Sequence, residues 1–531
     1  MNAPAIPANR RLVALVLGGA VALLAVLLLV RACGGADEPP KSEAASFFPD
    51  TSLVFASLST DGDRDAVQRA VDVAERFGAY DANRDALLKR LAGDDKPVDA
   101  EKDVAPWLGD EAAFALIDTG NETAGSLLAL EVTDEDAARK FLERNPRDAV
   151  RKSYKGRDTV RYGQVTTAFV ADYLVIGQDP TVQAAIDREV SNAKPLSESE
   201  TYERAIEGLP DGRVVTAYAS ADGLRRLLAP QGSLLGALAA TLDQPGLQGV
   251  ALAAEARDDD TLRIQAHSTL DRAQQGRAGF KPFTPGLIDD VPEDALAYLG
   301  ASGVSGALQR LVVSAVAGTG QGGEVTELLS RLGTELDKQT GGGLQDDLLK
   351  LFDGEVGLVI EQRVPAPVFS IVTRTDDEEG TRRTLDRLRD PLAKLLRPAG
   401  EPELRWSPQD IDGADGWTLT LPNGAQITYA VTGGKLILST SPEGIRAIAS
   451  GDGSLAGADA FEDVLGDRPE EVGTLGFLDF SQLLELGEQT GLNDSQAYQR
   501  VREDLRRVRA VGVSSTSSEG ESTAEILVSI R

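Results

Sequence analysis

Two series of matching segments run through the chain in the same order, one in each half. Each pair combines an apolar, strand-like stretch with the same kind of turn or helix start beside it. The matched pairs are Phe47–Ser59 with Asp290–Ser302, Leu108–Asp118 with Phe352–Glu361, Ser126–Asn145 with Val368–Leu388, and Ala171–Asp187 with Gly433–Ala449. Because consistent local signals specify one fold, the pattern predicts a tandem duplication, with repeat units at 47–270 and 289–531 and a linker at 271–288.

The order of strands and helices inside each repeat indicates the fold class. Strand-like stretches follow one another through short turns, and Asn423–Gly424 between two apolar runs is a strong hairpin signal. Each repeat ends in two adjacent strands, at Leu247–Leu270 and at Val508–Ile530. Connections this short favour antiparallel pairing, so the sequence predicts an α+β fold in which helices pack on one side of an antiparallel sheet.

Several helix starts can be predicted from single residues. Thr133 and Thr375 each follow a strand and precede acidic residues, which favours threonine as the N-cap. Ser441 precedes Pro442, the arrangement typical of an N-cap followed by the first helical position. The second copy is also longer than the first. The difference in residue number between matched positions increases along the chain, and this increase places the extra residues in an insertion at Arg397–Gly416.

An uncharged apolar run at Leu12–Val30 predicts where the chain resides. At a rise of about 1.5 Å per residue it spans about 28 Å, close to the roughly 30 Å hydrocarbon core of a bilayer. Arg10 and Arg11 precede the run, so the positive-inside rule leaves residues 1–11 in the cytoplasm. The sequence therefore predicts a single-pass signal anchor at 12–30, a tether at 31–46 and an extracytoplasmic bulk at the cell membrane.

Cys33 leaves alternatives open for this anchor. The stretch Val30–Cys33 is similar to a bacterial lipobox, whose cysteine is lipidated, although Arg31 fits that motif poorly. Plain cleavage of the apolar segment is a further alternative. Since Cys33 is the one cysteine of the chain, an intramolecular disulfide is impossible, and we expect the residue to have no role in folding.

The charge of the chain excludes some partners. Its formal net charge is −30, whereas a nucleic-acid binder must place Lys and Arg against phosphates. The same balance argues against adhesion to an anionic membrane surface through a basic patch. We therefore expect no nucleic-acid partner, and contact with the membrane only through the N-terminal helix.

The arrangement as a whole resembles a known family. The N-terminal apolar helix, the Pro and acidic residue before each first strand, and the acidic, glycine-containing turns at Gly109–Asp110 and Asp353–Gly354 are similar to bacterial envelope proteins of the Domain of Unknown Function 3352 family. The resemblance covers nearly all of 47–531. It implies an exported, membrane-anchored protein and supplies no catalytic residue.

Candidate functional residues are few. Asp61, Asp63 and Asp65 have the spacing of a calcium loop, and Asp410 and Asp412 form a second acidic group, but acids at helix starts and turns explain both. Glu111 and Glu355 occupy matching positions and could form an acid–base pair if the copies faced each other. His267 is the one histidine, so a multi-histidine metal site is excluded, and no cofactor is expected.

These observations favour a non-enzymatic protein that binds or scaffolds at the cell envelope, with an envelope protein or an apolar ligand as its partner. The first alternative is a carrier of a lipid or other apolar ligand, held in a groove between the repeats by the apolar stretches Leu227–Leu242 and Ala307–Gly318. The second alternative is a hydrolase that uses the two glutamates. Neither the ligand nor the oligomeric state follows from the sequence.

Overall fold

The structure is a computed structural model of the whole chain. It describes Pro40 and residues 43–78, 100–118, 124–143, 149–163, 165–191, 194–228, 246–271, 281–303, 350–363, 366–397, 401–451 and 453–531. These residues form two compact units, each of which combines helices with antiparallel strands. The first unit takes the residues up to 277 together with Val501–Leu505 and Ser518–Glu525, and the second takes the rest.

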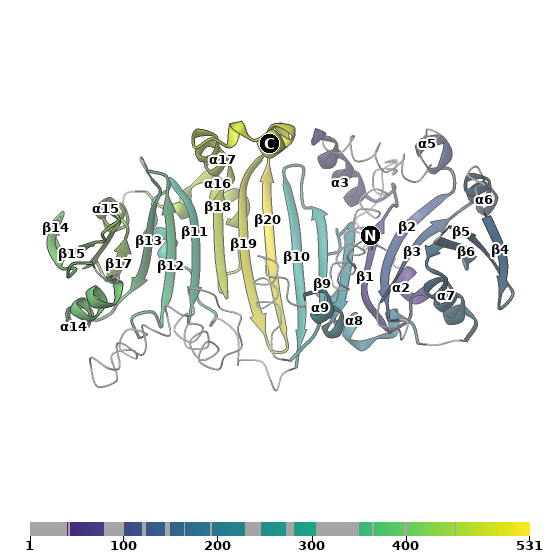
Figure 1. The fold of residues 1–531 in the computed structure, drawn as a ribbon, viewed down its shortest axis with the longest axis horizontal. Helices are drawn as coiled ribbons and strands as arrows, with labels where there is room; N and C mark the ends of the chain where they lie inside the picture. The colour runs from purple at the N-terminus through teal and green to yellow at the C-terminus, as the bar shows by residue number, and fades with distance from the viewer. Residues whose placement is uncertain are drawn as a thin grey trace. The chain divides into compact units, whose positions relative to one another are not determined.

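The first unit is built on strands that pair in the spatial order β4-β5-β6-β7-β3-β2-β1-β8-β9-β10, all antiparallel (Figure 1). Its strands are β1 (Ser52–Ser59), β2 (Leu108–Ile117), β3 (Gly125–Val132), β4 (Ala149–Tyr154), β5 (Arg157–Tyr162), β6 (Val165–Val170), β7 (Tyr173–Gly177), β8 (Val215–Ser220), β9 (Leu247–Ala256) and β10 (Thr261–Leu270). Its helices are α2 (Ala44–Phe47), α3 (Asp65–Glu75), α5 (Ala100–Asp103), α6 (Glu135–Glu143), α7 (Asp179–Ser191), η1 (Leu196–Glu198), α8 (Glu200–Glu207) and α9 (Ala221–Leu228).

The strands of the second unit pair in the order β14-β15-β16-β17-β13-β12-β11-β18-β19-β20 (Figure 1). They are β11 (Ala295–Ser302), β12 (Glu355–Glu361), β13 (Val368–Arg374), β14 (Trp406–Ile411), β15 (Ala414–Thr420), β16 (Gln426–Thr432), β17 (Lys435–Ser439), β18 (Thr474–Asp479), β19 (Val508–Ser518) and β20 (Glu521–Ile530). The helices are η2 (Leu287–Asp289), α14 (Glu378–Leu396), α15 (Pro442–Ser450), η3 (Leu455–Gly457), α16 (Asp459–Leu465), α17 (Phe480–Gln489), η4 (Leu492–Asp494) and α18 (Gln496–Leu505), whose last turn belongs to the first unit.

The two units have the same strand order, and their registers correspond residue by residue. Ser59 pairs with Glu111 at the end of β1, and Ser302 pairs with Glu355 at the end of β11. The correspondence continues across each sheet, so that Leu127 on β3 corresponds to Ser370 on β13. A residue of one unit can therefore be compared directly with its equivalent in the other.

Helices cover both faces of the first sheet. On one face Ile186 of α7 and Tyr202 of α8 pack on Phe55 and other strand residues, and on the opposite face Val67 of α3 packs with Leu58. The prediction that helices lie on one side was therefore wrong, whereas the antiparallel α+β fold is confirmed. The physical reason is visible in β2, where Ala112–Ile117 are all apolar and buried, because a strand covered on both faces is apolar at successive positions.

The second unit also has apolar clusters on both faces of its strands. The larger one joins α15 and α16 to β11, β12, β13 and β18, with Ile445 and Phe461 among its fully buried side chains. The smaller one places Leu385 of α14 against Tyr429 and Leu436. Residues expected to lie in the linker also belong to this unit's core, since Leu287 and Ile288 are buried there.

The predicted N-caps were only partly right. Ser441 accepts a hydrogen bond from the Glu443 N–H at 3.1 Å, and Pro442 opens α15, as expected. The threonine caps were wrong, because α6 and α14 begin later than predicted. Asp134 accepts from the Ala137 N–H at 2.9 Å and Asp377 from the Gly380 N–H at 2.8 Å, so carboxylates rather than hydroxyls cap these helices.

This difference predicts which residue stabilises α6. Replacing Asp134 with alanine should lower the free energy of unfolding of the first unit by about 1 kcal/mol, the usual loss for a removed N-cap. Thr133→Ala should change it by less than about half as much, because a surface substitution away from a cap has little effect. Urea unfolding followed by the fluorescence of Trp107 would measure both changes, and a larger loss for Thr133→Ala would contradict the assignment.

The predicted insertion contains only part of the extra length of the second unit, because α14 adds residues before it and the β15–β16 turn adds residues after it. The helix α14 has 19 residues where α6 has 9, and β14 begins only at Trp406. Asp410–Gly416 instead lies in the β14–β15 hairpin, which corresponds to β4–β5 of the first unit. The predicted hairpin at Asn423–Gly424 is confirmed between β15 and β16, where Gly424 adopts a φ of 84°.

Some predictions fall on residues that the structure does not describe. These are the signal anchor at 12–30, Cys33, the stretch Ala307–Gly318 and most of Leu227–Leu242. Among the helices that are described, none has the length and apolar character needed to cross a bilayer.

Candidate functional site

Glu111 and Glu355 hold the segment that enters each unit. The buried Glu111 accepts hydrogen bonds at Oε2 from the Ala44 N–H at 2.8 Å and from the Tyr173 hydroxyl at 3.1 Å. Glu355 accepts from the N–H groups of Gly286 and Leu287, next to η2, at 3.0–3.1 Å. Burial raises the pKa of Glu355, and these amide bonds oppose the rise.

Each of these carboxylates therefore has a structural role inside its own unit. It satisfies backbone N–H groups that the start of a short helix leaves without intrahelical partners. This role accounts for a glutamate at both positions without any acid–base reaction. The equivalence of the two residues reflects the same fold, because each lies opposite the last residue of the first strand.

The acidic groups proposed as cation ligands lie in turns and helix starts. Asp61 accepts from the Asp63 N–H at 2.9 Å, and Asp65 is the first residue of α3. Asp410 accepts from the Gly413 N–H at 2.8 Å in the β14–β15 turn, and the exposed Asp412 lies in that turn. Within the described residues, no three acidic, histidine or cysteine side chains are placed to hold a metal ion together.

His267 is a buried residue of the first unit's sheet. Its Nδ1 lies 2.8 Å from the carbonyl oxygen of Ala205, at hydrogen-bond distance. The imidazole also fills the space beside Gly208, where a Cβ atom would lie 2.6 Å from the ring. The residue thus joins α8 to β10 and lines neither of the cavities described below.

A cavity of about 280 Å³ opens in the first unit between α6 and the strands β4, β5 and β6. Its lining includes Arg139, Arg151, Lys152, Tyr162 and Phe169. The Arg139 guanidinium lies 4.5 Å above the Phe169 ring, and the Arg151 guanidinium pairs with Glu143 at 2.9 Å. Basic and aromatic side chains thus meet here on the surface of a strongly acidic protein.

A second cavity, of about 460 Å³, opens in the second unit between α14 and the strands β14, β15 and β16. Trp417 and Tyr429 form an aromatic wall, and the Arg389 guanidinium stacks on Trp417 at 3.6 Å from the ring centre. Trp406 packs against Tyr429 edge to face, at 5.3 Å between ring centres. Burial raises the pKa of the Tyr429 hydroxyl, so this group stays protonated.

The two cavities occupy the same place in the fold. Each is bounded by the helix after the third strand and by the three strands that extend the sheet beyond β7 or β17. Arg139 and Arg382 stand at equivalent positions, each in an ion pair with the glutamate that starts its helix. Arg382 donates to the carbonyl oxygen of Val431, and Val431 is the equivalent of Phe169.

Sequence reasoning missed both cavities. The available signal was the Glu-x-x-x-Arg pattern that opens the matched helices, at Glu135–Arg139 and Glu378–Arg382. That pattern also stabilises any exposed helix by pairing residues four apart, so it does not by itself indicate a site. The aromatic residues Trp417 and Tyr429 lie on β15 and β16, and the sequence does not show that these strands face α14.

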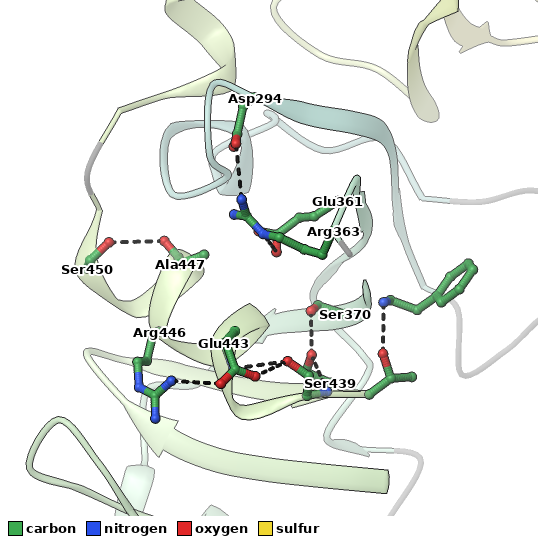
Figure 2. Close-up of polar contacts among 12 residues, drawn as sticks. Asp294, Glu361, Arg363, Ser370, Ser439, Glu443, Arg446, Ala447 and Ser450 are labelled. Atoms are coloured by element: carbon green, nitrogen blue, oxygen red, sulfur yellow. Dashed lines mark hydrogen bonds and ion pairs between the residues drawn. The ribbon is translucent and has the colours of Figure 1, made fainter. Parts of the chain in front are cut away.

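The second unit also buries a carboxyl group that does not line its cavity, that of Glu361, which Figure 2 draws with its neighbours Arg363 and Asp294. Glu361 is 1% exposed, and neither of its carboxylate oxygens has a hydrogen-bond partner among the residues that the structure describes. The nearest cation is Arg363, whose Nε lies 3.6 Å from the carboxylate and which also contacts Asp294 at 3.4 Å. Burial raises the pKa of Glu361 to about 7, the Asp294 charge adds to the rise and Arg363 opposes it.

The first unit has an apolar side chain where Glu361 stands. The register of β2 and β12 makes Ile117 its equivalent, and Ile117 is buried in the first core. Nearby, the hydroxyls of Ser370 and Ser439 bond to each other at 2.9 Å (Figure 2), where the first unit has Leu127 and Gly177. This part of the second core is therefore more polar than its equivalent.

Comparison with known proteins decides the family. A family model described as a protein of unknown function, DUF3352, matches residues 12–530. The chain belongs to the DUF3352 family. The resemblance expected from the sequence is therefore confirmed over nearly the whole chain, and the DUF3352 description assigns no activity or ligand.

Other comparisons add little to the DUF3352 match. No protein with a curated description matches the chain. Crystal form IV of TP0453 is similar over 41% of this chain and 76% of its own, with 12% identity and a TM-score of 0.26. Crystal form III is similar over 46% and 89%, with 11% identity and a TM-score of 0.27. At these values the likeness carries no argument about fold or function.

Proposed function

We propose that this DUF3352 protein is a non-enzymatic binding protein, anchored in the membrane with its bulk outside the cytoplasm, that takes a small ligand in the cavities beside α6 and α14. The observation that carries the proposal is the occurrence of a cavity at the same place in both units. Cavities of a few hundred Å³, lined by aromatic and polar side chains, are typical of small-molecule sites.

The location of the protein rests on its sequence. The apolar run Leu12–Val30 behind Arg10 and Arg11 supports a single anchor with the remainder outside. A net charge of −30 suits a soluble domain that repels anionic surfaces while the anchor holds it near them. Both cavities then face the extracytoplasmic compartment.

We also infer that the units descend from one duplicated unit. Their identical strand order and matching register support this origin, as do the matched sequence segments. A duplicated unit retains the cavity of its parent, and the different linings at Val160 and Trp417, which are equivalent, then reflect divergence in ligand preference.

Binding is favoured over catalysis by the chemistry of the cavity walls. In each cavity the helix arginine is already paired, to Glu135 or to Glu378. Glu111 and Glu355, the acid–base candidates, bond to backbone amides and line neither cavity. Such walls can orient a ligand by stacking and hydrogen bonding and need no reacting group.

Native mass spectrometry of the full chain isolated from its own membrane tests the proposal. Lys152 and Gln409 are equivalent lining residues, and tryptophan at both positions should fill the cavities. We expect the wild-type chain to retain a small ligand that the Lys152→Trp, Gln409→Trp double variant loses. Ala149→Trp with Thr420→Trp, at exposed positions outside both linings, is the matched control. A wild-type chain without any bound ligand would contradict the proposal.

A further inference from the structure

The cavity of the second unit has a balanced set of hydrogen-bonding groups in its wall. The Arg389 Nη1 and the Tyr429 hydroxyl are buried and have no hydrogen-bond partner among the described residues. Tyr429 is 6% exposed, so these groups cannot be satisfied by bulk water where they lie. A buried polar group without a partner is costly, and a bound ligand or water that reached it would remove that cost.

Acceptors and a further donor lie nearer to the solvent. The exposed Asp415 side chain makes no hydrogen bond or ion pair in the described part of the chain, and Asp410 uses one carboxylate oxygen in its own turn. The side-chain Oε1 of Gln409 accepts from the Thr418 hydroxyl at 2.8 Å, which leaves the side-chain amide N–H groups of Gln409 to donate elsewhere. The wall thus offers both donors and acceptors to one ligand.

The charges of the wall oppose an ion of either sign. The lining also includes Asp386, which pairs with Arg389, while Arg382 pairs with Glu378. At close range the two guanidinium groups still disfavour a cation, and Arg389 already covers one face of the Trp417 ring. The carboxylates of Asp410 and Asp415 disfavour an anion. A neutral ligand whose hydroxyls both donate and accept, and whose C–H groups can lie on an aromatic ring, meets neither repulsion.

We infer that the cavity between α14 and β14–β16 binds a neutral polyhydroxylated ligand, such as a sugar unit of a glycan. The inference rests on the proposed function, because it names the ligand class of one of the two cavities. Trp417 supplies the stacking surface, Asp415 and Asp410 accept from ligand hydroxyls, and Gln409 donates to them. The first unit has valine at Val160 in place of Trp417, so its cavity lacks this surface.

Titration of the full chain with trisaccharides tests the inference. The chain is kept in a detergent without a sugar headgroup, and three matched probes are used: the trimers of N-acetylglucosamine (neutral), glucosamine (cationic) and galacturonic acid (anionic), with glucose and mannose trimers as further neutral probes. We expect at least one neutral trimer to bind saturably and the charged trimers to bind at least about tenfold more weakly, by calorimetry.

Variants place the binding in the cavity. Trp417→Ala should weaken the binding of the neutral trimer at least about tenfold, and Asp415→Asn, at an exposed position that does not support the fold, should weaken it severalfold. Thr420→Ala, at an exposed position outside both linings, should leave it unchanged. Binding that survives both Trp417→Ala and Asp415→Asn would overturn the inference.

The outcomes separate this inference from the proposed function. If a charged trimer binds best and the Gln409→Trp change abolishes its binding, the cavity is a binding site but the ligand class is wrong. If no trimer binds while the isolated chain carries another ligand, the inference fails and the proposed function stands. If the chain neither carries a ligand nor binds any probe, both are wrong.

Discussion

Replacing Glu361 with isoleucine is expected to raise the free energy of unfolding of the second unit by about 3 kcal/mol at pH 8. Burial raises the pKa of this carboxyl from 4.5 to about 7, so at pH 8 the fold must hold an ionised group that the unfolded chain leaves in water. Arg363 lies 3.6 Å away and offsets part of that cost. Isoleucine is the residue that the first unit has at the equivalent position, where Ile117 is fully packed.

The same group predicts how stability changes with pH. Between about pH 4.5 and 7 the folded state keeps the proton of Glu361 and the unfolded state has lost it. The contribution of this group is therefore largest below pH 4.5 and is lost as the pH rises through about 7. In Glu361→Ile this part of the pH dependence should disappear, so the gain over the wild type should be small at pH 5 and full at pH 8.

Urea unfolding of the full chain measures these changes if its fluorescence reports one unit. Trp107 lies in the first unit and Trp406 and Trp417 in the second, so a Trp107→Phe background restricts the signal to the second unit. Ile117→Glu is the matched reverse change and should destabilise the first unit, because it buries a carboxyl in an apolar core. A Glu361→Ile protein that is less stable than the wild type at pH 8 would show that the carboxyl has partners that stabilise the fold.

Replacing Glu111 with alanine is expected to lower the free energy of unfolding of the first unit by about 3 kcal/mol. The change leaves the Ala44 N–H and the Tyr173 hydroxyl without the acceptor that they share, inside a well-packed region. Glutamine keeps an acceptor oxygen of similar reach, so Glu111→Gln should lose about half as much. Glu355→Ala should also cost less than Glu111→Ala, because Glu355 is less deeply buried.

Hydrogen exchange followed by mass spectrometry resolves this prediction by region. In Glu111→Ala the peptides that contain α2, β1 and β2 should exchange faster, and those of the second unit should be unchanged. Equal losses for Glu111→Ala and Glu111→Gln would show that the negative charge, rather than an acceptor oxygen, holds the entering segment.

The sequence was sufficient for those parts of the fold that local signals specify. The strand at Leu108–Ile117, the hairpin at Asn423–Gly424 and the cap at Ser441 follow from apolar runs, turn residues and capping preferences. The prediction that helices lie on one side of the sheet was wrong because polar and apolar residues alternate too little along β1 and β2. A strand with apolar residues on both faces must be covered twice, and the run EAAFALI already carried that information.

The cavities could not be predicted, because they depend on which residues of distant elements share a face. Trp417 and Tyr429 lie on the adjacent strands β15 and β16. Arg389 lies on α14, which precedes both strands in the chain and is separated from them by β14. Glu361 was not recognised either, since in the sequence it is merely the polar end of an apolar run. Only its pairing with Ala295 and Val368 shows that it is inside the core.

The position of β1 has a mechanical consequence. This strand follows the entering segment directly and lies between β2 and β8, with antiparallel pairing on both sides. If the chain is pulled from its N-terminal side, the force acts along β1, and its backbone hydrogen bonds to both neighbours bear the load in shear. An edge strand could peel away one bond at a time, whereas here many bonds must break together, after the Ala44–Glu111 contact has yielded. Tension applied from the N-terminal side therefore meets one of the most resistant places in the first unit.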